Sequence, residues 1–331
     1  MSGSIAVTWF GHRRTTELCA GLNIELAIYT TRLRGPLRYL LLGARTLRLF
    51  VRRQPDVVVV QNPSLILAAF ALVLRHVLGY RLIVDAHNEA VQPFKNRQRW
   101  VASLSRWVIR GADLTIVTNR HLAEQVVEQG GRPFILPDRV PSPPHAPAKK
   151  LSDRFNVVLV ATFDTDEPCS EVFAAVEGTD LELYVTGNSR KLTTAAAAAV
   201  PPNVHFTGYL NEQSYWSLLR AADAIVDLTL KENCLVCGSY EALALAKPMV
   251  LSDSPASREL FGASAVFTDN TSTDIRRALS QLRAERSTLE AAAECKRAEL
   301  TALWNSAARD LSAAIANSYA KPGASDSGLA N

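Results

Sequence analysis

The stretch LLRAADAIVDLTLKENCLVCGSYEALALAKPMVLSD, from Leu218 to Asp253, decides the fold class of this chain. An apolar run within Leu218–Leu230 and a second run at Pro248–Leu251 are each typical of a strand buried on both faces. Between them lies a loop, followed by a helix that we expect to begin at about Gly238. A strand, a helix and a further strand in this order predict a parallel sheet covered by helices.

The same alternation extends outward over the rest of the chain. In the first half, the pattern predicts strands at Ile5–Phe10, Ile24–Tyr29, Val57–Gln61, Arg81–Asp85 and Leu114–Thr118, and helices at Pro36–Arg53, Leu65–Leu78 and Arg97–Arg110. In the second half, it predicts strands within Asn156–Pro168, Leu181–Asn188 and Val204–Leu210. Two α/β domains are therefore expected, with chemistry in the loops that follow the strands.

Six prolines between Pro133 and Pro147 mark the expected boundary between the two domains. We predict an N-terminal domain over 1–132, a linker over 133–150 and a C-terminal domain over 151–288. Helices over 289–320 are expected to pack back toward the N-terminal domain, and the Gly- and Ser-rich residues 321–331 to form a flexible tail.

Composition excludes a fibrous or disordered chain, because 48% of the 331 residues are hydrophobic and 21% are charged. The first 150 residues carry 21 basic and 9 acidic side chains, and the remainder carry 15 and 23. The N-terminal domain is thus suited to a polyanion such as a phosphate, a nucleic acid or an anionic bilayer surface.

Five cysteines without a regular framework, and no basic-then-apolar leader before the first strand, indicate the cytoplasm. Cys234 and Cys237 form a lone Cys-x-x-Cys, for which packing is a better interpretation than zinc binding. The longest uncharged apolar run, Leu65 to Leu74, is shorter than the about 20 residues that span a bilayer. Any membrane contact should therefore be peripheral.

The helix that begins near Gly238 is the strongest candidate for a ligand site. Free N–H groups and the positive dipole end at a helix N-terminus suit a diphosphate. Glu241 lies near the first turn, where its carboxylate can accept hydrogen bonds from vicinal hydroxyls, as the acidic residue of a dinucleotide fold does with ribose. The alternative is that Glu241 only favours the helix dipole.

These residues resemble those of GT-B glycosyltransferases, especially glycosyltransferase family 4, in which Glu-x7-Glu and then Ala-x-Ala-x-Gly/Lys-Pro-Val bind the nucleotide sugar. Glu241 and the segment Ala242–Pro248 match the second part. In the first part Glu232 lies nine residues before Glu241 and Asn233 eight, so either one could contact the donor sugar. The resemblance implies a nucleotide-sugar site that includes Asn233, Gly238, Ser239, Glu241 and Gly187.

The family usually places an Arg and a Lys after the first strand of the second domain, whereas Ala161–Glu167 is acidic here. Arg190, Lys191 or Lys231 would then have to neutralise the diphosphate. Asp164-Thr165-Asp166 spells the Asp-x-Asp that holds a metal in another glycosyltransferase fold, but without that fold's context we expect no metal and no cofactor beyond the nucleotide sugar.

Four short segments also resemble chitobiosyl-diphospholipid β-mannosyltransferases. These segments are Gln61–Ser64, Asp85–Asn88, Leu136–Pro141 and Asp166–Pro168, in the same order as in that family. The resemblance agrees with an acceptor that is linked to a lipid diphosphate.

Strand alternation places Asp85 and His87 on one side of a strand end, with Asn88 and Glu89 in the loop beyond. A histidine oriented by a carboxylate can act as the general base for an acceptor hydroxyl, so His87 or Glu89 is the expected base and Glu232 a further catalytic candidate. The alternative for His87 is that it caps the loop backbone.

The His12-Arg13-Arg14 segment after the first strand is expected to be a loop that binds the acceptor's diphosphate, together with Asn88. The alternative is a solvated basic loop. Seven arginines and no acidic residue lie between Arg32 and Arg53, on a helix with one cationic and one apolar face. This pattern favours peripheral binding to an anionic membrane, while a nucleic-acid partner is not expected.

Together, these observations predict an α/β protein of the GT-B fold, with two Rossmann-like domains whose parallel sheets face a central cleft. The predicted function is transfer of a mannose- or glucose-type hexose from a UDP- or GDP-linked sugar to a lipid-linked or glycan acceptor in polysaccharide assembly, on the inner face of the cytoplasmic membrane. Two alternatives stay open, namely a nucleotide-sugar epimerase of the same fold and a non-catalytic membrane-associated partner of a glycosyltransferase.

Overall fold

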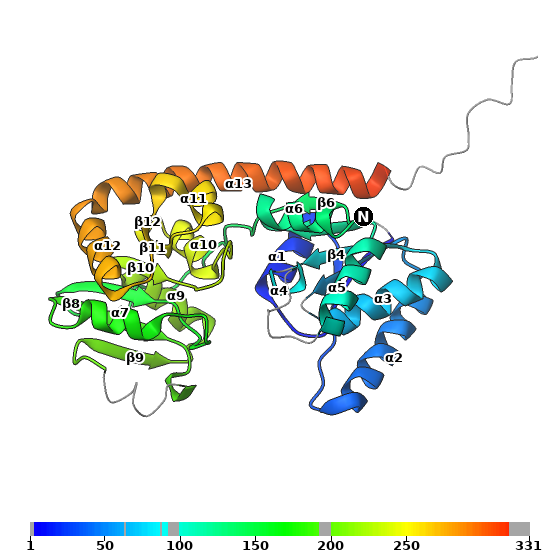
Figure 1. Ribbon diagram of the computed structural model, residues 1–331, viewed down its shortest axis with the longest axis horizontal. Coiled ribbons are helices and arrows are strands. Elements are labelled where there is room, and N and C mark those ends of the chain that lie inside the picture. Colours follow the sequence, from blue (N-terminus) through cyan, green and yellow to red (C-terminus); the bar gives the residue numbers. More distant parts are fainter. Residues whose placement is uncertain (1–2, 63, 87, 92–98, 192–199, 318–331) are drawn as a thin grey trace, which may run out of the picture. The chain divides into compact units, whose positions relative to one another are not determined.

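The computed structural model describes residues 3–62, 64–86, 88–91, 99–191 and 200–317, and the side chain of Glu89 lies outside this description. The chain divides into two compact units. Unit 1 comprises residues up to Asp138 together with those from Ala302 onward, and unit 2 comprises Arg139–Thr301. Each unit contains its own parallel sheet of six strands (Figure 1).

Unit 1 has the strand order β2-β1-β3-β4-β5-β6, and every neighbouring pair is parallel. Its strands are β1 (Ser4–Thr8), β2 (Glu25–Ile28), β3 (Val57–Asn62), β4 (Arg81–Ala86), β5 (Leu114–Val117) and β6 (Pro133–Ile135). Its helices are α1 (Arg13–Leu22), α2 (Gly35–Arg53), α3 (Leu65–Leu78), α4 (Asn88–Val91), α5 (Arg99–Gly111) and α6 (Arg120–Glu128).

Alternate residues of the strands enter two separate cores, one on each face of the first sheet. Val58 and Val60 of β3 pack with α2, α3 and α5, whereas Val57 and Val59 pack with α1. The apolar runs recognised in the sequence are therefore strands covered on both faces, as a parallel sheet requires.

Unit 2 repeats this architecture with the order β12-β11-β10-β7-β8-β9. Its strands are β7 (Phe155–Leu159), β8 (Leu181–Thr186), β9 (Val204–Gly208), β10 (Ala224–Asp227), β11 (Met249–Ser252) and β12 (Val266–Thr268). Its helical segments are α7 (Cys169–Val176), η1 (Ser189–Lys191), α9 (Glu212–Ala221), α10 (Cys237–Ala244), α11 (Pro255–Phe261), η2 (Gly262–Ser264) and α12 (Ser272–Ala284), followed by α13 (Arg286–Asn317).

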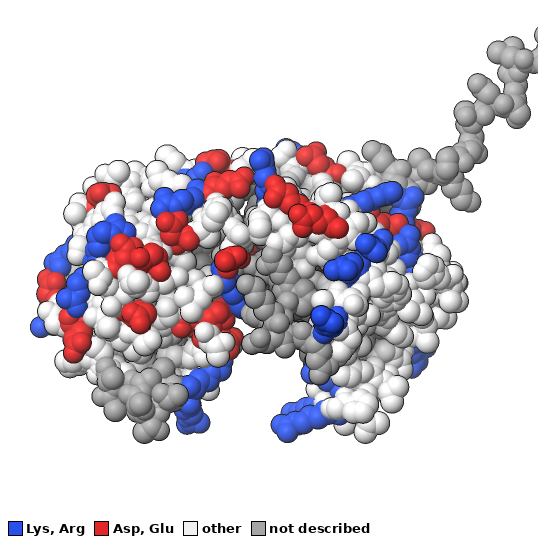
Figure 2. Space-filling view, in the orientation of Figure 1, with Lys and Arg blue, Asp and Glu red and all other residues white. Residues whose placement is uncertain are grey.

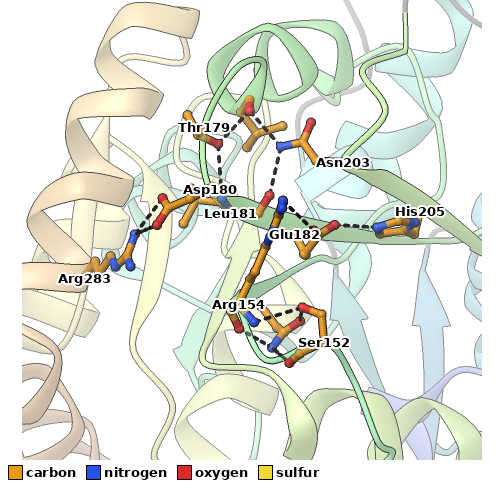
Figure 3. A network of polar contacts seen from close by, with 11 residues as sticks. Ser152, Arg154, Thr179, Asp180, Leu181, Glu182, Asn203, His205 and Arg283 are labelled. Carbon is orange, nitrogen blue, oxygen red and sulfur yellow. Dashed lines mark hydrogen bonds and ion pairs between the residues drawn. The ribbon is translucent and has the colours of Figure 1, made fainter.

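Polar contacts hold the amino ends of the strands in unit 2 (Figure 3). The carboxylate of Glu182, at the start of β8, accepts a hydrogen bond from Arg154 at 3.1 Å and lies 2.6 Å from Nε2 of His205 on β9. Arg283 of α12 pairs with Asp180 at 2.8 Å. These groups lie at the edge opposite the carboxyl ends of the strands, so we assign them a structural role.

The expected linker over 133–150 differs from the structure. Pro133–Ile135 forms β6, which pairs with β5 at the edge of the first sheet. An edge strand tolerates a proline because the missing N–H need not contribute to a ladder on both sides. Later residues of the segment lie along α9, where the carbonyls of Pro144 and Pro147 accept hydrogen bonds from Arg220 and Ser217.

The C-terminal residues form one long helix, α13, that contributes to both units. Leu289, Ala293 and Leu300 enter the cores of unit 2. Trp304 and Leu311 enter the core on the α1 face of unit 1. The expected tail over 321–331 lies outside the described residues.

Candidate functional site

The candidate donor site lies beyond the carboxyl ends of β7, β8 and β10 in unit 2. The loop after β7 approaches the end of β8 so closely that a Cβ on Gly187 would lie 2.2 Å from the carbonyl oxygen of Ala161. Gly187 also has φ of +88°, which disfavours any side chain. A glycine at this predicted donor residue is therefore required by the backbone itself.

Asp227, at the end of β10, joins the strand to the start of α10. Its Oδ2 accepts a hydrogen bond from the backbone N–H of Gly238 at 2.7 Å. A Cβ on Gly238 would lie 2.5 Å from the same oxygen. Burial, together with nearby Glu241 and Glu167, raises the pKa of Asp227 well above its ordinary value. One of the N–H groups that the sequence assigns to a diphosphate thus already has a protein acceptor.

Glu241 is 8% exposed and lies in α10, one turn beyond Gly238. Its Oε2 accepts a hydrogen bond from the hydroxyl of Tyr215, which belongs to α9. Burial and the adjacent Glu241 carboxylate raise the pKa of Tyr215, so the phenol keeps its proton and remains a donor. Sequence reasoning missed Tyr215 because nothing local links it to Glu241, 26 residues away.

The other predicted donor residues surround the start of α10 in different ways. Glu232 is exposed, whereas Asn233 is 8% exposed and adopts φ of 53° in the left-handed region. Ser239 is fully buried, and its hydroxyl donates to the carbonyl of Val236 at 2.5 Å. The Ser239 side chain is therefore part of the helix start rather than an exposed ligand contact.

Both lysines proposed for the diphosphate pair with the acidic loop after β7. Lys191 Nζ lies 3.5 Å from Asp164, and Lys231 Nζ lies 3.3 Å from Asp166. Asp166 also accepts from the hydroxyl of Thr229 at 2.9 Å. The two carboxylates of the Asp-x-Asp sequence thus have cationic partners. In the described ranges, His, Cys, Asp and Glu side chains form no cluster of three that could hold a metal.

The carboxylate of Glu167 binds backbone groups of its own acidic loop. Its carboxylate accepts from the backbone N–H groups of Thr162 and Phe163, at 2.9 and 2.7 Å, and from the hydroxyl of Thr162 at 2.7 Å. Consecutive N–H groups of this kind form a concavity that suits an anion. Here the anion is the chain's own carboxylate.

The candidate acceptor site lies at the carboxyl ends of β1, β3 and β4 in unit 1. The expected basic loop at His12–Arg14 is wrong, because Arg13 and Arg14 begin α1 and His12 is its N-cap. Arg14 is buried, and its guanidinium donates to Asp85 at the end of β4 at 2.9 Å and pairs with Asp138. A side chain held in this way fixes the site rather than binding a diphosphate from solvent.

The charges around Arg14 also affect His12. Burial alone would lower the pKa of Arg14, but Asp85 and Asp138 outweigh it and raise that pKa. Burial lowers the pKa of His12 even though both carboxylates act in the opposite direction. The imidazole of His12 is therefore neutral near pH 7 and can accept a proton.

The remaining acceptor-side residues are only partly described. Arg13 is exposed at the start of α1, and Asn88 is half-buried at the start of α4. His87 and the side chain of Glu89 lie outside the described residues. The pair between Arg14 and Asp85 nevertheless brings the start of α1 and the end of β4 together, across β3, which lies between β1 and β4 in the sheet.

A cavity of about 550 Å³ lies elsewhere in unit 1, lined by residues that include Phe50, Val77, Asp56 and Arg81. Asp56 and Arg81 lie at the amino ends of β3 and β4. The cavity is therefore at the opposite edge of the sheet from the candidate acceptor site, and we do not assign the substrate to it.

Family models match both halves of the chain. Residues 11–135 match a "Glycosyl transferase 4-like domain", and residues 167–285 match "Glycosyl transferases group 1". A search of curated proteins found no match.

Solved structures confirm the two-domain fold at low sequence identity. HepE from Anabaena, solved with UDP and glucose, is 12% identical with a TM-score of 0.74, over 95% of this chain and 99% of HepE. Sucrose-phosphate synthase from Thermosynechococcus elongatus is 13% identical with a TM-score of 0.78, over 96% and 99%. A protein described as a UDP-N-acetylglucosamine 2-epimerase from Listeria monocytogenes is 13% identical with a TM-score of 0.65, over 98% of each chain.

Proposed function

We propose that this chain, which belongs to the GT-B glycosyltransferases and carries one glycosyltransferase domain in each unit, transfers a hexose from a nucleoside diphosphate sugar to a lipid-linked or glycan acceptor. The observation that carries the donor assignment is the buried Glu241 carboxylate, oriented by Tyr215 beside the start of α10. A carboxylate held in this orientation is suited to accept hydrogen bonds from two vicinal hydroxyls.

Among donors, a uridine nucleotide is our first choice. HepE has the same fold and was solved with UDP-glucose. A GDP-linked mannose donor is the second choice, in keeping with the resemblance to β-mannosyltransferases. In both cases the ribose would bind Glu241 and the diphosphate would lie near the start of α10, with Lys191 and Lys231 released from the acidic loop to neutralise it.

The reaction breaks the bond between the anomeric carbon and the diphosphate oxygen and forms one to an acceptor oxygen. The nucleoside diphosphate leaves with the bonding electron pair, and the acceptor hydroxyl loses its proton. Groups that stabilise the departing diphosphate are therefore the main catalytic requirement in unit 2. In unit 1, His87 and Glu89 are the proposed bases, and the neutral His12 is a third residue able to take the proton.

A lipid-linked acceptor accounts for the strongly basic N-terminal half of the chain. Among the described residues, no helix combines the length and the apolar content that a membrane span needs. We therefore propose peripheral contact between Arg32–Arg53 and an anionic membrane, at the cytoplasmic face, where the nucleotide sugar is available.

Thermal shift with UDP, GDP, ADP, CMP and dTDP, followed by isothermal titration, tests the donor site. One diphosphate at 100 times its dissociation constant should stabilise the protein by about 2.7 kcal/mol. Glu241→Ala should abolish this shift, while Glu182→Ala, at the opposite edge of the same sheet, should retain it. Full nucleotide binding by Glu241→Ala would overturn the donor assignment.

Two alternative functions have specific support. The Listeria structure shares the fold, so a nucleotide-sugar epimerase is the second candidate, and it would convert the donor without any acceptor. The acidic loop that pairs with Lys191 and Lys231 favours the third candidate, a non-catalytic partner of a glycosyltransferase. Product analysis without acceptor identifies the epimerase, and failure to bind any nucleotide identifies the non-catalytic partner.

A further inference from the structure

Helices α2, α3 and α5 form a single layer over one face of the first sheet (Figure 1). Each helix buries apolar residues in the same core, including Leu42 and Phe50 of α2, Leu67 and Leu72 of α3, and Val108 of α5. Because α3 contacts both α2 and α5, the outer sides of the three helices form one continuous surface. We call it the helical face.

The helical face carries charge of one sign. None of the residues in α2, α3 and α5 is acidic, whereas nine are arginine: Arg38, Arg45, Arg48, Arg52, Arg53, Arg75, Arg99, Arg106 and Arg110. Within the described residues, ion pairs involve Arg53 with Glu25 and Arg75 with Asp113. In Figure 2 the visible surface over α2 and α3, at the lower right, is white and blue without red side chains.

The same surface exposes large apolar side chains that a water-facing helix layer would normally lack. Along α2, Leu37, Leu40, Leu47 and Val51 are 62%, 68%, 38% and 52% exposed. Their spacing of three, seven and four residues places them in one stripe, away from the buried stripe that contains Leu42 and Phe50. The arginines of α2 lie alongside this apolar stripe.

The neighbouring helices continue the pattern that the sequence predicts for α2. Ile66, Val73 and Val77 form an exposed stripe on α3. On α5, Trp100 and Trp107 are exposed and lie seven residues apart, on the side of the helix opposite the buried Ile109. Arg99, Arg106 and Arg110 share a spacing of seven and four residues and form a basic stripe on α5.

These observations distinguish between two partners of a basic face, a nucleic acid and an anionic bilayer. A nucleic acid needs cations and stacking aromatics, but it gives no reason to expose leucine, isoleucine and valine along two helices. An anionic bilayer uses all three components, because aliphatic side chains enter the acyl boundary, tryptophan prefers the headgroup level, and arginine binds the anionic headgroups.

We propose that the helical face formed by α2, α3 and α5 docks on an anionic lipid bilayer, with Trp100 and Trp107 of α5 as interfacial anchors. This deepens the peripheral membrane association proposed above, because it extends the contact from one helix to three and assigns it to one side of the first sheet. The carboxyl ends of the unit 1 strands stay outside the docking surface.

Sedimentation of the full chain with vesicles tests this proposal. Vesicles of phosphatidylcholine with about one third phosphatidylglycerol should bind the protein, and vesicles of phosphatidylcholine alone should bind it at least about tenfold more weakly. Raising the salt to about 1 M should weaken the binding without abolishing it, because the apolar contact is not screened. Equal binding to both vesicles, or binding to neither, would overturn the proposal.

Paired variants locate the contact. Trp100→Ser with Trp107→Ser, and separately Leu37→Ser with Leu40→Ser, should each reduce partitioning by about tenfold. The matched control is Leu303→Ser with Arg309→Ser on α13, which packs against the other face of the sheet and exposes both side chains. Unchanged binding by both test pairs, or equal loss in the control, would contradict the assignment.

Two further measurements keep the outcome interpretable. Circular dichroism and melting temperature establish that each variant is folded, and nucleotide binding by the same preparations reports separately on the donor site. Retained nucleotide binding without vesicle binding would rule out membrane docking by the helical face, and with it the peripheral membrane contact, and would leave the proposed sugar transfer standing. Dimerisation that is lost in the tryptophan pair, without lipid binding, would assign the face to a second copy instead.

Discussion

The Oδ2 atom of Asp227 lies 2.7 Å from the backbone nitrogen of Gly238 and within 2.5 Å of where a Cβ on that residue would stand. One carboxylate therefore both caps the start of α10 and excludes any side chain at its second residue. The glycine that the sequence suggests for diphosphate binding is required first by a contact inside the protein. The contact also occupies one of the backbone N–H groups at the helix end that would attract a diphosphate.

Gly238→Ala should destabilise unit 2 and weaken nucleotide binding, because the new methyl group cannot coexist with Asp227. We expect a loss of about 1–3 kcal/mol in the free energy of unfolding, measured by urea denaturation. Gly43→Ala in α2 is the control, since its methyl would meet the ring of Phe70 at 3.7 Å, an ordinary contact. The double variant with Asp227→Ala should recover part of the loss, and no recovery would refute the proposed clash.

Asp227→Asn should stabilise the protein at neutral and alkaline pH. Since the pKa of Asp227 is raised in the folded state, its contribution to stability is complete below the unfolded value near 3.9 and is lost as the pH rises through the folded value. Asparagine keeps an acceptor for Gly238 without a charge. The melting temperature should exceed that of the parent by about 2–4 °C or more at pH 8, and the difference should shrink toward pH 5. A constant difference across this range would contradict the prediction.

Arg14→Met should destabilise unit 1 by about 3–5 kcal/mol, because Asp85 and Asp138 would lose their shared cation in a buried environment. The matched control is Arg53→Met, whose pair with Glu25 is 58% exposed on both sides and should cost less than about 1 kcal/mol. Chemical denaturation of both variants gives the comparison. Similar values for the two would show that Arg14 does not hold the strand ends together.

Tyr215→Phe should leave the fold intact and weaken nucleotide binding by about tenfold, since a hydrogen bond to a charged group typically contributes about 1.5–3 kcal/mol. Titration with the preferred nucleotide measures the change. Tyr184→Phe, on β8 of the same unit and with its ring beside His205, is the control and should bind normally. An unchanged dissociation constant in Tyr215→Phe would separate Tyr215 from the donor site.

Much of the fold could be predicted from local patterns. Runs such as Val57–Val60 are apolar at every position, which is the requirement of a strand covered on both faces. The prolines from Pro133 onward predicted a linker that begins at residue 133, where the structure has a strand. A proline at a sheet edge and a proline in a linker look alike in sequence. The helix at Arg13–Leu22 was missed where basic residues near its start suggested a loop.

The sequence by itself determined the two parallel α/β units, the position of the helix that begins near Gly238, and the basic amphipathic character of α2. Only the tertiary structure decided which charged residues already have partners within the protein. It buried Arg14 between Asp85 and Asp138, paired Tyr215 with Glu241, and turned Lys191 and Lys231 toward the acidic loop. The physical reason is the sequence distance over which each kind of interaction acts. Strand and helix patterns depend on neighbours within a few residues, whereas a polar partner is chosen by proximity in space, which here joins Arg14 and Asp85 across 71 positions of sequence.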